Sequence, residues 1–199
     1  MADMEKTGKN LEGRGFRVHR FATGAEAAEF LVQTLHGTSI GIGGSVTIDT
    51  LGVYDRLCGS NEVFWHWKNH APETRERAGK AETYLCSANG VSENGEIVNI
   101  DGFGNRVAGT IYGPERVFLV VGRNKIAPDL TGAIDRARNI AAPLNARRLS
   151  RHTLCAVGEP RCHDCRSPEK VCGVMTVFFM PPTSIKEFHV ILVDEDLGY

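Results

Sequence analysis

The run Arg116-Val-Phe-Leu-Val-Val121 is apolar at every position after its arginine. A strand with one buried face alternates apolar and polar side chains, whereas a strand covered on both faces does not. Residues 116–121 therefore predict the centre of a parallel sheet. Further strands are predicted at residues 16–20, 39–42, 62–67, 83–87, 174–180 and 188–193. Because helices alternate with these strands, the sequence predicts an α/β fold whose mainly parallel sheet is flanked by helices.

Capping residues and apolar spacing predict the helices. Thr23-Gly-Ala-Glu26 has the form of a capping box, and Gly37 ends the helix that it opens. Asn94-Gly95 is a strong hairpin signal, which predicts that residues 90–92 pair with residues 96–100. Further helices are predicted at residues 46–58 and 73–78, shortly after residue 106, and from Pro128 to a stop at Pro143.

Length and composition limit the class of protein. A chain of 199 residues is most simply one domain, and 42% hydrophobic and 24% charged residues are ordinary values for a globular protein. The net charge of -1 gives no positive field for nucleic acid, and no apolar run is long enough to span a bilayer. Residues 1–10 carry charges and lack the apolar region of a secretory signal, so we expect a cytoplasmic protein.

Four cysteines near the C-terminus have the spacing C-x6-C-x2-C-x6-C: Cys155, Cys162, Cys165 and Cys172. The residues between them are polar and turn-forming, so residues 150–173 have no apolar core of their own. Four thiolates on one metal centre would hold such a segment together. We therefore predict one metal centre, an iron–sulfur cluster or zinc, and the spacing does not choose between them. The alternatives are unligated thiols, or disulfides, which require an oxidising environment.

The remaining cysteines, Cys58 and Cys86, lie in apolar contexts and are expected in the core. Arg147 and Arg148 lie just before the cysteine segment, where their positive charges would offset the negative charge of the thiolates.

A glycine-rich loop, Gly41-Ile-Gly43-Gly44-Ser45-Val-Thr47, follows a predicted strand and precedes a predicted helix. Glycines allow a tight turn here, and the free N–H groups of a helix N-terminus bind phosphate or carboxylate. Ser45 and Thr47 would add hydroxyl donors, so Gly43, Gly44, Ser45 and Thr47 are candidate anion-binding residues. The alternative is a serine that caps a helix and has no ligand. The loop lacks the full dinucleotide-binding and P-loop patterns.

Polar residues also follow two other predicted strands. Asp101-Gly-Phe-Gly-Asn105-Arg106 comes after residues 96–100, and Gly122-Arg-Asn124-Lys125 comes after residues 116–121. Ligand sites in parallel sheets form at the carboxyl ends of strands, so we expect both segments to share one cavity with the glycine-rich loop. Asn105, Arg106 and Asn124 would bind an anion there, and Asp101 and Lys125 are candidate catalytic residues. The alternative for residues 101–106 is an Asx-type turn that caps the next helix.

Six segments together resemble the LUD-domain family, the lactate-utilisation proteins of the LutC/YkgG kind. They are Gly41-Ile-Gly-Gly-Ser-Val-Thr47, Ser87-Ala-Asn89, Asn99-Ile-Asp-Gly-Phe-Gly-Asn-Arg106, Ile111-Tyr-Gly-Pro114, Val121-Gly-Arg-Asn-Lys-Ile126 and Ala142-Pro-Leu-Asn-Ala-Arg-Arg148. The likeness runs from about residue 16 to the end of the sequence. It implies one LUD domain with a fold related to the ribose-5-phosphate isomerase, glucosamine-6-phosphate deaminase and CoA-transferase group (NagB/RpiA/CoA transferase-like).

The resemblance also implies a role in the bacterial oxidation of L-lactate to pyruvate, beside other lactate-utilisation subunits that include iron–sulfur proteins. The sequence lacks a ferredoxin-type C-x2-C-x2-C-x3-C run, so it is not the subunit with paired clusters. Two hypotheses remain. In the first, the chain is an enzyme or enzyme subunit that acts on a small anionic metabolite. In the second, it is a non-catalytic binding or assembly subunit with a structural metal site. A homo-oligomer is compatible with either.

Overall fold

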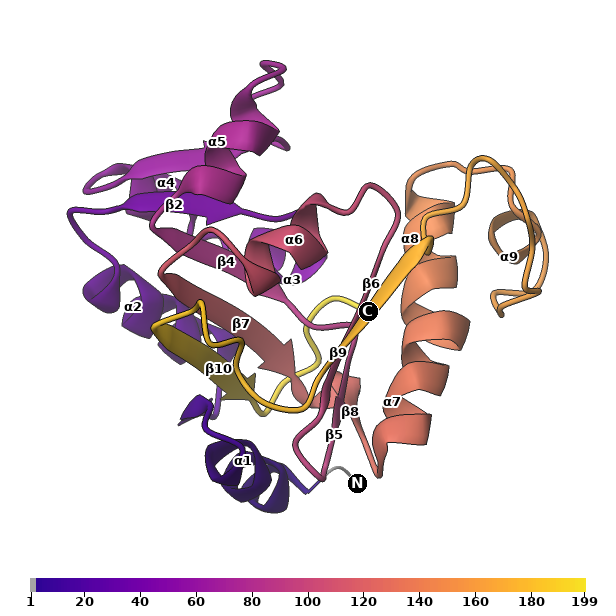
Figure 1. Cartoon of the computed structure of the whole chain (residues 1–199), viewed down its shortest axis with the longest axis horizontal. Helices are drawn as coiled ribbons and strands as arrows, with labels where there is room; N and C mark the ends of the chain where they lie inside the picture. Colours follow the sequence, from indigo (N-terminus) through magenta and orange to yellow (C-terminus); the bar gives the residue numbers. More distant parts are fainter. Residues whose placement is uncertain (1–2) are drawn as a thin grey trace.

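The computed structural model describes residues 3–199 and is built around a six-stranded parallel sheet (Figure 1). In their order across the sheet, its strands are β1 (Arg17–Phe21), β10 (Glu187–Val193), β7 (Arg116–Gly122), β4 (Thr83–Ser87), β2 (Ser39–Ile42) and β3 (Glu62–Trp65). Every pair of neighbours is parallel. Strand β7 lies inside the sheet and is buried from Val117 onward, which confirms the prediction made from its apolar sequence.

Alternate residues of β7 pack on opposite faces of this sheet. Val117, Leu119 and Val121 belong to one apolar cluster, while Phe118 and Val120 belong to another. Helices α1 (Met4–Gly13) and α5 (Thr74–Lys80) contribute to the first cluster. Helices α2 (Gly24–Thr34), α3 (Val46–Thr50) and α4 (Tyr54–Cys58) contribute to the second. The predicted α/β architecture, with helices on both faces of a parallel sheet, is therefore confirmed.

A second sheet has four short strands, in the order β8 (Ile126–Ala127), β5 (Gly90–Ser92), β6 (Ile97–Asp101) and β9 (Val174–Phe178). Strands β5 and β6 form the predicted antiparallel hairpin, and Gly95 in its turn has a φ of 90°. The prediction that residues 96–100 end at the edge of the parallel sheet was wrong. A hairpin partner is antiparallel by construction, and β6 pairs with β9 outside the all-parallel sheet.

Two helix predictions need correction. The helix predicted at residues 46–58 is divided into α3 and α4, because Gly52 between them has a φ of 64°, outside the right-handed helical region. Helix α1, capped by the side chain of Asp3, was not predicted at all. Its sequence is mostly polar, and of its residues only Thr7, Gly8 and Leu11 are buried.

Pro143 does not end the helix before it. Helix α7 (Leu130–Arg136), a π-helical turn (η2, Ala137–Ala141) and α8 (Ala142–Arg148) follow one another without a break. Pro143 closely follows the π-helical turn, where the i→i−4 hydrogen-bond pattern is already interrupted, so a residue without an N–H is tolerated there. This long helix stands beside the second sheet, and α9 (Leu154–Val157) with the cysteine segment lies beyond it (Figure 1). No helix within residues 3–199 has the length and hydropathy needed to cross a bilayer.

Helix α6 (Asn105–Ile111) completes the elements near the site, on the same side of the main sheet as α5 (Figure 1). Its Gly109 lies against the ring of Tyr84 in β4, where an added Cβ would be 2.5 Å from the ring. Glycine at this position therefore lets α6 approach the sheet closely.

A tight contact between β2 and α5 gives a test of the fold. A Cβ added at Gly41 would lie 2.0 Å from the carbonyl oxygen of Ala78, which is backbone and cannot rotate away. We expect Gly41→Ala to lower the free energy of unfolding by about 1–3 kcal/mol in urea denaturation. Gly79→Ala, in the same helix and with nothing within 4 Å, is the matched control and should be neutral or slightly stabilising. Equal stability of the two variants would contradict this packing.

Candidate functional site

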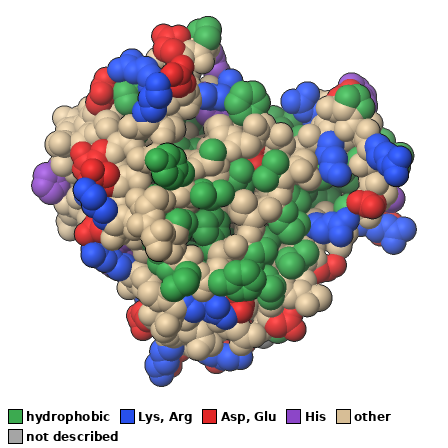
Figure 2. Space-filling view, in the orientation of Figure 1, with side chains coloured by type: hydrophobic (Ala, Val, Ile, Leu, Met, Phe, Trp, Pro, Cys, Tyr) green, Lys and Arg blue, Asp and Glu red, His purple; other side chains and the backbone are tan. Residues whose placement is uncertain are grey.

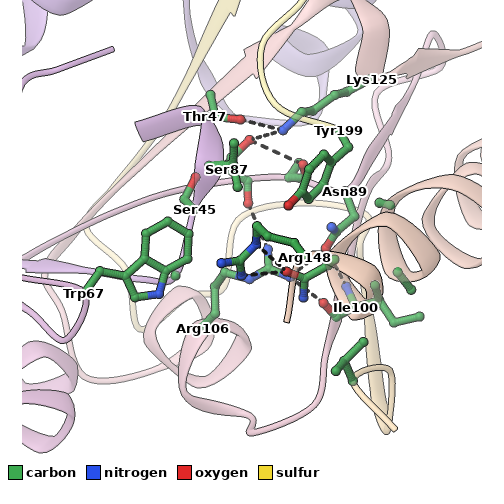
Figure 3. Close-up of a pocket in the computed structure, with 17 residues that line it drawn as sticks. Ser45, Thr47, Trp67, Ser87, Asn89, Ile100, Arg106, Lys125, Arg148 and Tyr199 are labelled. Carbon is green, nitrogen blue, oxygen red and sulfur yellow. Dashed lines mark hydrogen bonds between the residues drawn. The ribbon is translucent and has the colours of Figure 1, made fainter. Parts of the chain in front are cut away.

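A cavity of about 60 Å³ lies where the carboxyl edge of the main sheet meets the second sheet and α8 (Figure 3). Since one water needs roughly 10–15 Å³, the cavity has room for a ligand of a few non-hydrogen atoms. Its polar lining comes from several elements, including the 3₁₀ turn η1 (Arg123–Lys125). The polar residues are Ser45 and Thr47 at the start of α3, Ser87 and Asn89 at the end of β4 and just after it, Arg106 in α6, Lys125 in η1, Asn145 and Arg148 in α8, and the last residue, Tyr199.

Lys125 is the most unusual residue of this cavity. Its side chain is only 3% exposed, and within residues 3–199 it forms no ion pair. Its Nζ donates to Thr47 Oγ1 at 2.7 Å and to Ser87 Oγ at 2.8 Å (Figure 3). Burial, reinforced by the positive charges of Arg136 and Arg106, lowers the pKa of Lys125 from 10.5 to about 7. A large fraction of this amine is therefore neutral at physiological pH.

The two hydroxyls match the hydrogen-bonding needs of a neutral amine. Ser87 Oγ donates its own proton to the carbonyl of Val120 at 2.6 Å, and Thr47 Oγ1 donates to the carbonyl of Leu197 at 3.2 Å. Each hydroxyl oxygen is thus left as an acceptor for Lys125. A neutral amine has two N–H groups and one lone pair, so both of its donors are satisfied and the lone pair remains free. Such a lysine can act as a base or a nucleophile.

Two arginines place positive charge at the cavity: the half-buried Arg106 lines it, and the buried Arg136 lies near it. The Arg106 guanidinium donates to Asn99 Oδ1 at 2.8 Å, to Asn89 Oδ1 at 2.7 Å and to backbone carbonyls. Arg136 donates to the backbone carbonyls of Asn124 and Asn89, and burial lowers its pKa to about 10. All these acceptors are neutral, so within residues 3–199 neither guanidinium forms an ion pair with a carboxylate. Buried charge without a counterion favours an anionic ligand.

One polar atom of the cavity wall has no partner. The hydroxyl of Tyr199 is buried and lies beside the Arg148 guanidinium, but it makes no hydrogen bond of normal geometry within the described part of the chain. The neighbouring Arg148 guanidinium lies over the ring of Trp67, 4.7 Å from its centre, and closes the side of the cavity opposite Lys125. A ligand oxygen would satisfy the tyrosine hydroxyl, which otherwise carries a desolvation cost.

The structure brings five of the predicted site residues together at this cavity: Gly44, Ser45, Thr47, Arg106 and Lys125. Gly43 lies behind it, and a Cβ there would meet the side chains of Arg106 and Tyr84 at 3.0 Å. Asp101 and Asn105 instead line an open cleft of about 700 Å³ that adjoins the cavity. Asn124 is used elsewhere, because its amide binds the backbone of Leu197 and Gly198 and holds the C-terminal segment.

Two of the predicted residues cap helices, and their predicted roles in catalysis and anion binding stay predictions. The carboxylate of Asp101 accepts from the backbone N–H groups of Phe103, Arg106 and Val107 at 2.9–3.2 Å, so it caps α6, as the alternative interpretation had it. Ser45 likewise caps α3 by accepting from Ile48 N at 3.3 Å. Because α3 has only 5 residues, the long helix expected to direct its dipole into the cavity is absent there.

Ser87 and Asn89 were not predicted as site residues. Ser87 is the last residue of β4 and Asn89 follows it, and the carboxyl end of β4 lies at the same sheet edge as that of β7. The rule that identified Lys125, a polar side chain at the carboxyl end of a buried strand, would have identified them as well. Tyr199 reaches the cavity wall through tertiary packing, and no local sequence pattern points to it.

The four cysteines of the C-terminal segment line a second cavity, of about 180 Å³, together with His163. All four are free thiols in the structure. Within residues 3–199 no three His, Cys, Asp or Glu side chains lie close enough to hold one metal ion, so the four sulfurs do not converge on a single point. A metal centre here stays a prediction. Of the other two cysteines, Cys86 is in the core as expected, but Cys58 is exposed, because it lies at the end of α4.

Comparison with known proteins identifies a family and a related structure. The family model for the LUD domain matches residues 4–193. The crystal structure of a DUF162 family protein from Deinococcus radiodurans superimposes with a TM-score of 0.56 at 13% identity, covering 96% of this chain and 95% of that one. At this identity the likeness shows a shared fold. No curated protein matches the chain.

The lowered pKa of Lys125 predicts a pH dependence of stability. Between pH 7 and 10.5 the unfolded chain binds about one more proton than the folded one at this site, so folding becomes more favourable as pH rises. We expect the stability of the wild type relative to Lys125→Met to increase by about 2 kcal/mol between pH 7.5 and 9. Chemical denaturation at both pH values measures this. Identical pH dependence of the two proteins would mean that the buried amine stays charged.

Proposed function

The chain belongs to the LUD domain family, and from this membership and the Lys125 cavity we propose that it is a cytoplasmic subunit in the bacterial oxidation of L-lactate to pyruvate. The proposal is that the cavity binds a small carboxylate anion, L-lactate or pyruvate. The observation that carries it is the buried Lys125, which has hydroxyl partners, no carboxylate partner and an opening to a cavity of metabolite size.

Charge and size both support a small carboxylate as the ligand. The guanidinium groups of Arg106 and Arg136 have only neutral acceptors, and Arg148 lies at the cavity wall. Their combined field favours one negative charge, and a cavity of about 60 Å³ suits a three-carbon acid better than a nucleotide. The hydroxyl of Tyr199 provides a donor that has no other use in the described structure.

In the proposed reaction Lys125 handles a proton. Oxidation of L-lactate to pyruvate removes two electrons and two protons, one of them from the 2-hydroxyl. The free lone pair of Lys125 would accept this hydroxyl proton, and a pKa of about 7 suits a base that works near neutral pH. The two electrons of the C2–H bond would pass to acceptors of the iron–sulfur class, which the resemblance assigns to the accompanying subunits, and the C2 proton would pass to water. Asp101, occupied as a helix cap, is a weaker candidate for the base.

A subunit needs a surface for its partners. Large apolar side chains are exposed on β9 and just after it: Val174, Phe179 and Met180. Figure 2 shows hydrophobic side chains gathered across the middle of this face, where Figure 1 has β9 and α6. Contiguous exposed apolar surface is typical of protein–protein contacts. It supports the proposed association with other lactate-utilisation subunits, or with a second copy of the chain.

We also propose a relationship to the NagB/RpiA/CoA transferase-like folds. The parallel sheet and the glycine-rich loop that follows β2 support it.

Binding measurements test the proposed ligand. We expect L-lactate and pyruvate to bind the wild type in calorimetric titrations at pH 7. Lys125→Met should weaken binding roughly 10- to 100-fold, because the protonated form of Lys125, still well populated at pH 7, has a third N–H that can donate a charge-assisted hydrogen bond to a carboxylate. Lys186→Met is the matched control, since Lys186 is exposed and pairs only with Glu115 at the surface. The proposal fails if neither acid binds, or if both variants bind like the wild type.

Turnover separates an enzyme from a binding subunit. With L-lactate and an artificial electron acceptor, the enzyme hypothesis predicts a rate that rises as pH increases through about 7, as Lys125 loses its proton. Tight binding of L-lactate without turnover, in the presence of partner subunits as well as alone, would instead support the non-catalytic binding or assembly subunit.

A further inference from the structure

We infer that the four cysteines of residues 150–173 hold one cubane iron–sulfur cluster, and that neither a zinc ion nor a disulfide is their natural state. The four ligands come from separate positions of the segment. Cys155 lies in α9, Cys162 and Cys165 lie in the irregular chain after it, and Cys172 lies just before β9. All four line the same cavity of about 180 Å³.

The size of the cavity favours a cluster over a single ion. Zinc binds four sulfurs at about 2.3 Å, which places the sulfurs about 3.8 Å from each other. Within residues 3–199 no three potential ligands are placed to share one metal ion, yet the four cysteines line one cavity. A cubane cluster has an iron atom at each of four corners and binds one thiolate at each, so it needs no three thiolates on a single ion. Four thiols that line one cavity suit this arrangement.

Hydrogen bonds to sulfur provide a second, independent indication. The backbone N–H of Asp164 donates to Cys162 Sγ at 3.4 Å, and the Arg138 guanidinium donates to the same sulfur at 3.4 Å. Asp164 adopts a φ of 48°, a left-handed conformation that is uncommon for a residue other than glycine. Such donors stabilise a thiolate ligand and tune the potential of a cluster. The positive charge of Arg138 also offsets the net negative charge of a cluster with four thiolates.

Polar contacts, rather than an apolar core of its own, hold the segment against the rest of the protein: Arg147 donates to the carbonyls of Ala156 and Gly158, and Cys162 N donates to Asn139. Leu154 and Val157 of α9 are 57% and 67% exposed, so this helix contributes little apolar burial. Residues 158–173 contain no helix or strand. A structureless connection of this length inside a compact protein is generally functional, and a bound cluster would organise it.

Anaerobic purification followed by metal analysis tests the inference. We expect about four iron atoms and four sulfide ions per chain, a visible absorbance band that dithionite bleaches, and an electron paramagnetic resonance signal from the reduced cluster. If the protein is isolated without metal, the same result should follow incubation with ferrous iron and sulfide. One zinc ion per chain without sulfide after reconstitution under both conditions, or thiols that bind neither metal, would overturn the inference.

Serine variants locate the cluster. Cys162→Ser should lose most of the iron and sulfide, while the circular dichroism of the α/β core stays that of the wild type. Cys58→Ser is the matched control, because Cys58 is an exposed cysteine in α4, far along the chain from the cavity, and its iron content should be unchanged. Equal iron in the two variants would show that the cysteine cavity is not the site. These readouts do not use lactate, so they are independent of the proposed function.

Discussion

The hydrogen bonds of one half-buried guanidinium hold the two sheets of this protein together at the edge where the cavity forms. Arg106 donates to the carbonyl of Ser87 at the end of β4 and to Asn99 and Ile100 in β6. Ser87 belongs to the parallel sheet, and Asn99 and Ile100 belong to the second, mixed sheet. If the two sheets moved apart, each of these acceptors would lose its hydrogen bond in a poorly solvated environment, so the arginine fixes the distance between the sheets. The cavity occupies the gap between them.

The same arrangement explains the state of Lys125. A guanidinium keeps its charge even when buried, whereas an amine can release its proton. With Arg106 and Arg136 already charged nearby, the ammonium form of Lys125 is the costly one, and the pKa of this lysine falls to about 7. The hydroxyls of Thr47 and Ser87 then fix the orientation of the neutral amine. Such a site combines positive charge and a base in one cavity. Burying these groups lowers the stability of the folded protein, and the packing of the surrounding core offsets this loss.

The sequence predicted those features that depend on local pattern. The apolar run of β7, the hairpin at Asn94-Gly95 and the capping box at Thr23 are all found in the structure. Lys125 was identified as a candidate because polar residues after a buried strand point to the edge of a parallel sheet. The errors arose where tertiary packing decides. Pro143 was taken as a helix stop because a π turn cannot be predicted from composition, and the partners of Asn124 lie more than seventy residues away, in the C-terminal segment.

One long helix contributes to two cavities. Before the π turn, Arg136 reaches the carbonyls of Asn89 and Asn124 near Lys125, and Arg138 within the turn reaches Cys162. After the turn, Ala142, Asn145 and Arg148 line the Lys125 cavity, while Ala142, Pro143 and Ala146 line the cysteine cavity. Ile100 and Val171 complete this shared wall. An anion bound beside Lys125 would therefore lie one layer of side chains from whatever the cysteines hold. Such proximity gives a change of charge at either cavity a direct electrostatic effect on the other, because the wall between them is apolar and screens little.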